Sequence, residues 1–177
     1  MAWTTFGKKQ IFLIVLVVLC GICGTGKAEA LTPPQAATPT LLSFGVGMFN
    51  IFRIHPHPQF QVEYRSSYRF WKVCLPLAGF LITSKGSTYL FGGFAIDLRI
   101  GDNLAITPSI AAGLYAKGGG KNLHYPLEFR SSIECAYVFQ NQSRFGIQLS
   151  HISNASLSSR NPGVESIMCT YSLPLCD

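Results

Sequence analysis

The chain has 177 residues, of which 48% are hydrophobic and only 12% are charged, and its formal net charge at pH 7 is +6. Soluble domains usually carry about 25% charged residues, so this composition is unusual for a soluble domain. The positive charge agrees with contact to anionic lipid headgroups, and the export signal described next excludes nucleic acid as a partner.

The N-terminus has the pattern of a secretory signal peptide. Lys8 and Lys9 precede a run of apolar or small residues over 11–24, and small residues follow at Ala28 and Ala30. A helix of that length rises only about 21 Å, short of the roughly 30 Å hydrocarbon core of a membrane. We therefore predict a signal peptide over residues 1–30, an unfolded Pro- and Ala-rich lead over 31–40, and a single domain over 41–177.

From Leu41 onward, apolar and polar residues alternate in a way that predicts eight strands. The expected spans are 41–51, 60–70, 74–83, 88–100, 104–116, 126–139, 143–153 and 165–175. A soluble sandwich would turn the apolar face inward, whereas a small outer-membrane barrel turns it toward lipid and encloses the charges. No apolar run after residue 30 approaches the length of a spanning helix. We predict an all-β fold, an eight-stranded antiparallel outer-membrane β-barrel.

Charged residues on the polar faces of these strands are expected to form a structural ion-pair network inside the barrel. Its predicted members are Glu63, Arg65, Arg69, Asp97, Arg99, Glu128, Arg130, Glu134 and Arg144. Loop lengths fit a barrel with both termini in the periplasm. The segments 52–59, 117–125 and 154–164 are long, those at 71–73, 101–103 and 140–142 are short, and 84–87 is an outer loop of minimal length.

No metal and no other cofactor is expected. His55 and His57 each precede a proline, and histidines on a Pro-rich loop are more often solvated than ligating. Cys135 and Cys169 lie on predicted strands separated by a third, about 9.6 Å apart, which is too far for a disulfide. A bridge from Cys176 to another cysteine stays open.

The most informative stretch lies near the C-terminus. His151 and Ser153 are followed by Glu165 across the turn 161–163. A base, a hydroxyl and a carboxylate are the three parts of an activated-serine hydrolase. Residues two apart on a strand share a face at roughly 6.5 Å spacing, so the imidazole can reach the hydroxyl. Glu165 would return on the next strand of the hairpin.

All three residues fall on the apolar faces of their strands. His151 and Ser153 continue the series Phe145, Ile147, Leu149, and Glu165 leads the series Ile167, Cys169, Tyr171, Leu173. A lipid-facing Lys or Arg costs about 2–4 kcal/mol at the membrane midplane, and acidic residues or interfacial positions cost less. A polar cluster on this face therefore suggests a function, with a plain position at the membrane interface as the competing explanation.

Water and lipid ester bonds meet at that depth, which indicates acyl-ester chemistry. We expect Ser153 to attack an acyl ester and His151 to take its proton. Glu165 would orient the imidazole and stabilise its charged form, and Asn154 would donate a hydrogen bond to the oxyanion.

The stretch His151-Ile152-Ser153-Asn154-Ala155, through Asn161-Pro162-Gly163 to Glu165, resembles the lipid A 3-O-deacylase family of outer-membrane hydrolases, called PagL-like or acyloxyacyl hydrolase. Four upstream blocks resemble its alphaproteobacterial branch: Glu63-Tyr64-Arg65, Gly101-Asp102-Asn103, Thr107-Pro108-Ser109 and Pro126-Leu127-Glu128-Phe129-Arg130-Ser131. The resemblance implies a barrel in the bacterial outer membrane that removes the ester-linked 3-hydroxyacyl chain at position 3 of lipid A. It assigns the base to His151, the nucleophile to Ser153, the acidic member to Glu165 and an oxyanion contact to Asn154.

Other functions stay open beside this one. One is a structural or surface barrel without catalysis, and another is a phospholipase or acyltransferase that uses the same triad. The residues specify acyl-ester chemistry better than they specify the acyl group. Lipopolysaccharide and the outer membrane are the expected partners, and the sequence does not decide between a monomer and a homodimer. The chain also ends Leu173-Pro174-Leu175-Cys176-Asp177, without the aromatic last residue that such barrels commonly use in assembly.

Overall fold

The computed structural model describes residues 38–53 and 55–175, and all regular elements in this part are strands. They are β1 (Leu41–Phe49), β2 (His57–Arg65), β3 (Cys74–Thr83), β4 (Thr88–Ile96), β5 (Leu98–Ile100), β6 (Leu104–Ala116), β7 (Leu127–Val138), β8 (Arg144–Ser153) and β9 (Val164–Pro174). The predicted all-β class is confirmed. No helix in the described part of the chain is long and apolar enough to cross a membrane. The predicted signal peptide and residues 31–37 of the predicted lead lie outside the described residues.

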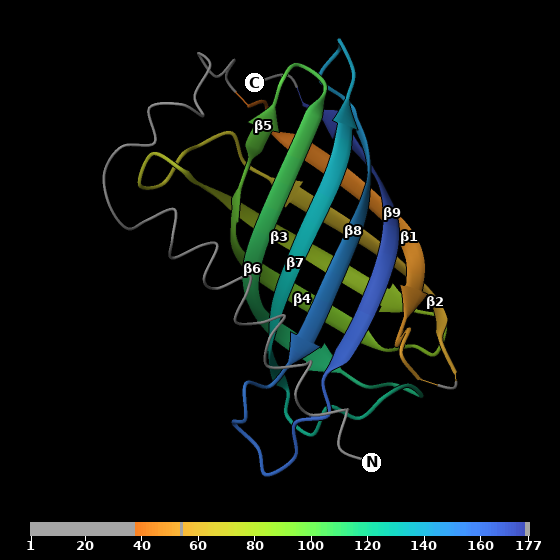
Figure 1. The fold of residues 1–177 in the computed structure, drawn as a ribbon. Helices are drawn as coiled ribbons and strands as arrows, with labels where there is room; N and C mark the ends of the chain where they lie inside the picture. The colour runs from red at the N-terminus through yellow and green to blue at the C-terminus, as the bar shows by residue number, and fades with distance from the viewer. Residues whose placement is uncertain (1–37, 54, 176–177) are drawn as a thin grey trace. The chain divides into compact units, whose positions relative to one another are not determined.

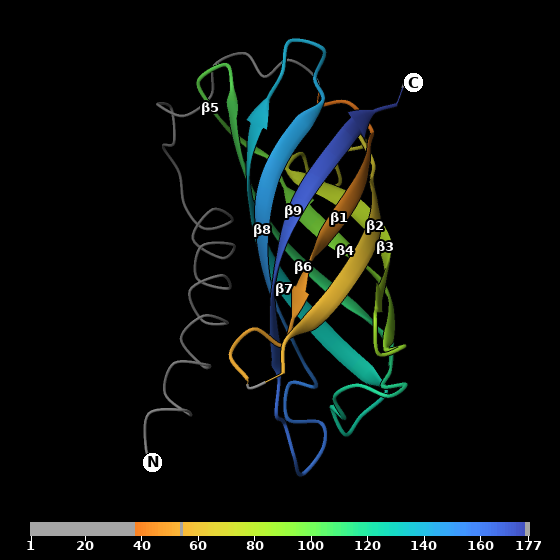
Figure 2. The same cartoon turned by 90° about the vertical axis from the view of Figure 1, so that its right-hand side faces the viewer.

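Antiparallel pairing closes the strands into a barrel, as Figures 1 and 2 show. The sheet runs β4-β3-β2-β1-β9-β8-β7-β6-β5, and an additional pairing of β4 with β6 joins its ends. The three-residue β5 pairs only with β6 and continues the line of β4 beyond Asp97. Counting β4 and β5 as one interrupted strand, the barrel has the predicted eight strands.

Side chains alternate strictly between the two faces of the barrel wall. In β8 the exposed residues Phe145, Ile147 and Leu149 alternate with the buried Arg144 and Gln148. The outer face is apolar around the barrel, with Leu90 61% exposed and Val46 59% exposed. The charges lie inside, which is the parity of a membrane barrel and the reverse of a soluble sandwich. The predicted orientation of the strands is therefore confirmed.

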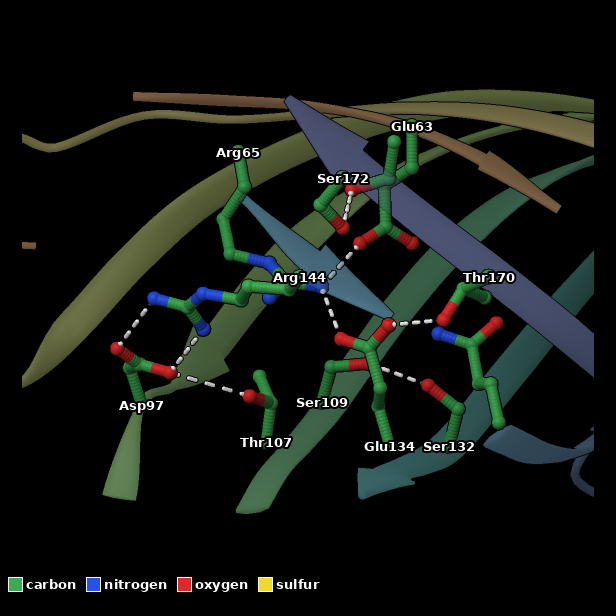
Figure 3. Close-up of polar contacts among 12 residues, drawn as sticks. Glu63, Arg65, Asp97, Thr107, Ser109, Ser132, Glu134, Arg144, Thr170 and Ser172 are labelled. Carbon is green, nitrogen blue, oxygen red and sulfur yellow. Dashed lines mark hydrogen bonds and ion pairs between the residues drawn. The ribbon is translucent and has the colours of Figure 1, made fainter. Parts of the chain in front are cut away.

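One half of the lumen is filled by the predicted ion pairs, shown in Figure 3. Arg144 binds the Asp97 carboxylate with two parallel hydrogen bonds of 2.6 and 2.9 Å. Arg65 contacts Glu63 at 2.8 Å and Glu134 at 3.2 Å. These side chains are 1–2% exposed, so each charge depends on its partner in place of water.

Two predicted members of this network behave differently. Glu128 is fully buried, but neither of its carboxylate oxygens has a hydrogen-bond partner within the described chain. Arg69 lies in the connection between β2 and β3 and donates to the Thr38 hydroxyl at 3.1 Å, so this contact is not an ion pair. Thr38 also donates to Asp97 at 3.1 Å and is buried. The last residues of the predicted unfolded lead are therefore attached to the barrel interior.

The other half of the lumen holds a cluster of apolar and aromatic side chains. Its members are Phe49, Leu77, Leu81, Tyr89, Phe91, Ala95, Ala111, Tyr115, Leu123, Ile152 and Val164. Arg130 joins the two halves, because its guanidinium lies 4.7 Å from the centre of the Phe91 ring and it donates to Gln148 at 2.7 Å. A Cβ at position 79 would come within 2.4 Å of the Phe91 ring, so glycine at this position makes room for it. The lumen is a packed core rather than a pore.

Long loops gather at one end of the barrel, which we call the loop end. They are residues 50–56, 117–126 and 154–163, with the short connection 84–87 beside them. At the opposite end, β2 stops at Arg65, although the predicted strand ran over 60–70. Ser66 accepts a hydrogen bond from the Tyr68 amide, and Trp71 has φ of 48°. These local bonds favour a turn over strand pairing, despite the alternating polarity of the segment.

The predicted absence of a bridge between Cys135 and Cys169 is confirmed. Both are unbridged and exposed, and each pairs with Ile147 of β8, which separates them. Cys176 lies outside the described residues.

The ion pairs of the lumen should stabilise the barrel unequally. Arg144→Leu would remove the two short hydrogen bonds to the buried Asp97 carboxylate and leave it the longer contact with Arg99, at 3.5 Å. We expect a loss of about 3–5 kcal/mol in the free energy of unfolding. Urea unfolding of the refolded protein in detergent micelles, followed by circular dichroism, measures this loss.

Arg99→Leu is the matched control, because the Arg99 side chain is 16% exposed and its contact with Asp97 is longer. Its expected loss is about 1 kcal/mol or less. Equal unfolding midpoints for the two variants would contradict the assigned role of Arg144.

Candidate active site

The candidate triad lies on the outer face of β8 and β9, at the loop end of the barrel. His151 and Ser153 continue the outward series of β8, and Glu165 stands two residues before the exposed Ile167 of β9. The pairing of β8 with β9 places His151 and Glu165 directly opposite each other. The face and the hairpin register are those predicted from the alternation.

The base and the acid are in contact. His151 Nδ1 lies 3.4 Å from Glu165 Oε1, and the two side chains are 11% and 10% exposed. With Nδ1 turned toward the carboxylate, Nε2 is the ring nitrogen left to accept a proton from a nucleophile. A carboxylate in this position holds the ring orientation and stabilises the imidazolium that forms during catalysis.

Ser153 is next along the same face and is 7% exposed. It lies at the end of β8, where its partner on β7 is Phe129. Among the described residues no hydrogen bond joins its hydroxyl to His151, so the link between nucleophile and base stays a prediction. Such bonds are often long before substrate binds and shorten in the reacting complex.

Asn154 holds the β8–β9 loop in place. It is fully buried, and its Nδ2 donates to the carbonyls of Leu123 at 3.0 Å and Arg160 at 2.9 Å. Its Oδ1 accepts from the Ser156 amide at 3.0 Å. Because both amide hydrogens bind carbonyls, the predicted oxyanion contact from this side chain would need one of these bonds to break. The role that the structure displays for Asn154 is structural.

Three loops from different hairpins meet around the triad. The Glu165 carbonyl accepts hydrogen bonds from the amides of Asn50 at 2.8 Å and Ile51 at 3.1 Å. Lys121 Nζ donates to the Gly163 carbonyl and, at 3.2 Å, to Asn50 Oδ1. The 117–126 loop therefore ties the β1–β2 loop to the start of β9.

Gly163 packs directly against the ring of His151, the candidate base. A Cβ at this position would lie 2.7 Å from His151 Cε1 and 3.3 Å from Nε2, and the residue has φ of 55°. Only glycine fits both the conformation and the space. Sequence reasoning identified this glycine as a turn signal and did not reveal its contact with His151. It gave no signal for Lys121, because that contact joins two distant loops.

The triad side chains are largely covered by their neighbours, with His151 11%, Glu165 10% and Ser153 7% exposed. Two hollows, of about 760 and 300 Å³, are lined by turn residues around Asn103 and by loop residues around Tyr125, and neither includes the triad. Behind the triad, Ile152 and Val164 pack into the apolar half of the lumen. The described residues contain no group of three or more His, Cys, Asp or Glu side chains that could hold a metal. His57 faces the lumen, with Nδ1 at 3.2 Å from the His55 carbonyl.

Solved structures with a similar fold include membrane barrels. The crystal structure of the outer membrane enzyme PagL superposes with a TM-score of 0.62 at 22% identity, covering 76% of this chain and 99% of that one. A de novo designed transmembrane β-barrel gives a TM-score of 0.56 at 8% identity, covering 80% and 98% of the two chains. At these identities the similarity establishes the eight-stranded barrel fold.

Sequence comparison identifies the family. Comparison with curated proteins gives no match. The model of the family described as lipid A 3-O-deacylase (PagL) matches residues 42–174, which is the whole barrel from β1 to β9. The chain belongs to the lipid A 3-O-deacylase (PagL) family.

Proposed function

We propose that this protein is a serine esterase of the outer membrane that removes the ester-linked 3-hydroxyacyl chain at position 3 of lipid A. Membership of a lipid A deacylase family supports deacylation of lipid A, and the barrel is that of an outer-membrane protein. The observation that carries the serine mechanism is the 3.4 Å contact between His151 and Glu165, beside Ser153 on the lipid-facing surface.

The proposed reaction has two acyl-transfer steps. Ser153 Oγ attacks the acyl carbonyl carbon while His151 Nε2 takes the hydroxyl proton. The bond from the carbonyl carbon to the sugar oxygen then breaks, and His151 returns the proton to that oxygen as the sugar leaves. Water, deprotonated by the same ring, attacks the acyl-serine and releases the fatty acid and the serine hydroxyl. Glu165 stabilises the imidazolium in both steps.

The position of the site suits a lipid ester. Ile167 and Leu149 of the same face are 39% and 47% exposed, and they lie next to Glu165 and His151 on the side away from the loops. Acyl chains can lie along this apolar wall while the sugar stays in water at the loop end. The loops there carry Arg53, Lys85, Lys117 and Arg160, all exposed, and no acidic residue among those that the structure describes. This charge favours the phosphate groups of lipid A.

Mass spectrometry tests the proposed reaction directly. Lipid A from cells that express the protein should lose the mass of one hydroxyacyl chain, and the matching free fatty acid should appear. Loss of a different acyl group would indicate another ester substrate. Unchanged lipid A, in cells that contain the folded protein in their outer membrane, would contradict the enzyme assignment.

Substitutions in the triad should separate catalysis from folding. We expect Ser153→Ala and His151→Ala each to lower the deacylation rate by about 10³-fold or more, because triad members act as a unit. Glu165→Ala should be roughly 10- to 100-fold less severe, since it removes only the orienting carboxylate. The three variants should keep the heat-modifiable gel mobility of a folded barrel. Normal turnover by Ser153→Ala would exclude it as the nucleophile.

Gly163→Ala should lower activity by displacing the His151 ring, although His151 itself is unchanged. The added methyl group must displace the His151 ring, and a misplacement of about 1 Å can lower kcat about 100-fold. Gly101→Ala is the matched control, because Gly101 has φ of 61° but nothing within 4 Å of the added Cβ. Both variants carry the same backbone strain, so an equal loss of activity in the two would contradict the role of Gly163.

A further inference from the structure

A second serine lies beside the catalytic base on the outer face. Ser131 of β7 is the direct pairing partner of His151, just as Glu165 is on the other side. Ser131, His151 and Glu165 therefore form one row across three neighbouring strands. The exposed Ile133 and Tyr137 follow Ser131 on the same face of β7, whereas Ser132 faces the lumen and binds the Ser109 hydroxyl at 2.6 Å.

The Ser131 hydroxyl is buried and has no partner. The residue is 4% exposed, and its Oγ makes no hydrogen bond within the described chain. Its neighbours are all larger: Ile110 is opposite on β6, and Phe129 and Ile133 precede and follow it on this face of β7. Because the Ser131 side chain is smaller than these neighbours, the outer surface is recessed at this position. Leaving a buried polar group unpaired is destabilising, and lipid tails cannot supply the missing partner.

We propose that Ser131 is a substrate-binding residue whose hydroxyl forms a hydrogen bond with an oxygen of the acyl chain being removed. This inference rests on the proposed function. Two oxygens of a 3-hydroxyacyl ester lie near the reacting carbon, namely the carbonyl oxygen and the 3-hydroxyl. Both can accept the Ser131 proton, and the experiment distinguishes them.

Around the His151 ring, the side toward β9 is occupied, and the side toward β7 is where we place the acyl chain. The β9 side of the ring is taken by Glu165, at 3.4 Å from Nδ1, and by Gly163, which packs against Cε1. On the β7 side Ser131 lies directly beside His151, so an acyl chain that reaches Ser153 from this side passes over Ser131. Rotamer changes of neighbouring side chains, which are common on binding, would open the hydroxyl to it.

Asn154 gives an independent reason to look for another donor. Its two amide hydrogens hold the carbonyls of Leu123 and Arg160, so its side chain is occupied. Hydroxyl side chains are among the groups that stabilise the oxyanion of acyl transfer. Ser131 is an unpaired hydroxyl in the same row as the base.

The test uses the purified full-length protein in detergent micelles and two lipid A substrates, one with a 3-hydroxyacyl ester and one with the same chain lacking the hydroxyl. If Ser131 binds the 3-hydroxyl, Ser131→Ala should lower kcat/KM about 3- to 10-fold on the first substrate only. If it binds the carbonyl oxygen, kcat should fall about 100-fold or more on both substrates, with an unchanged pH profile. Either result supports the proposal.

Two variants serve as controls. Ser132→Ala changes the adjacent serine on the lumen side and should leave both rates unchanged. Ser131→Cys keeps the volume but replaces the hydroxyl with a weak donor, so its rates should resemble those of Ser131→Ala.

Three results would overturn the proposal. The first is wild-type rates for Ser131→Ala on both substrates. The second is full activity of Ser131→Cys, which would indicate a packing role alone, and the third is a shifted pH profile for Ser131→Ala, which would indicate that Ser131 acts through His151. If the wild-type protein deacylated neither substrate, the proposed function itself would be contradicted.

Discussion

The pairing of buried arginines with carboxylates inside the lumen is the interaction on which the rest of the structure depends. Arg65, Arg130 and Arg144 are 1–2% exposed, and each contacts a carboxylate from another part of the barrel wall. Since side chains alternate with a period of two, placing one charge inside determines the face of every other residue on that strand. A slip by one residue would turn arginines toward lipid. The outward position of His151, Ser153 and Glu165 follows from the same constraint.

The barrel wall supplies the triad, but the loops supply its surroundings. The wall brings the His151 and Glu165 backbones together as a cross-strand pair, which is the closest approach that a sheet offers. Three loops then meet over this pair through Asn50, Lys121 and Asn154, and they set Gly163 against the imidazole. The apolar half of the lumen, with Ile152 and Val164, supports the site from behind. A rigid wall and bonded loops hold the His151 ring, the candidate base, in a fixed orientation on the outer face.

The proposed chemistry would also explain why polar groups lie on a lipid-facing surface. An unpaired hydroxyl in contact with acyl chains is costly, and on the outer face of β7, β8 and β9 a group of polar side chains gathers at the loop end. Ser131, His151 and Glu165 form one row across these strands. In the proposed reaction a lipid ester would bring its own oxygens to the same depth and supply the hydrogen-bond partners that lipid tails cannot. Polar residues elsewhere on the described strands point mainly to the lumen.

The sequence by itself determined the class, the strand number and the shared face of the triad, because these depend only on local alternation and on the spacing of residues within one hairpin. It did not determine where β2 ends, because the turn bonds of Ser66 and the contact of Arg69 with Thr38 override the alternation of residues 66–70. Nor could it show that the Asn154 side-chain amide donates to two loop carbonyls, that Gly163 contacts His151, or that Ser131 lies beside His151. Those contacts join residues far apart in the chain or on neighbouring strands, and only closure of the barrel fixes which residues face each other.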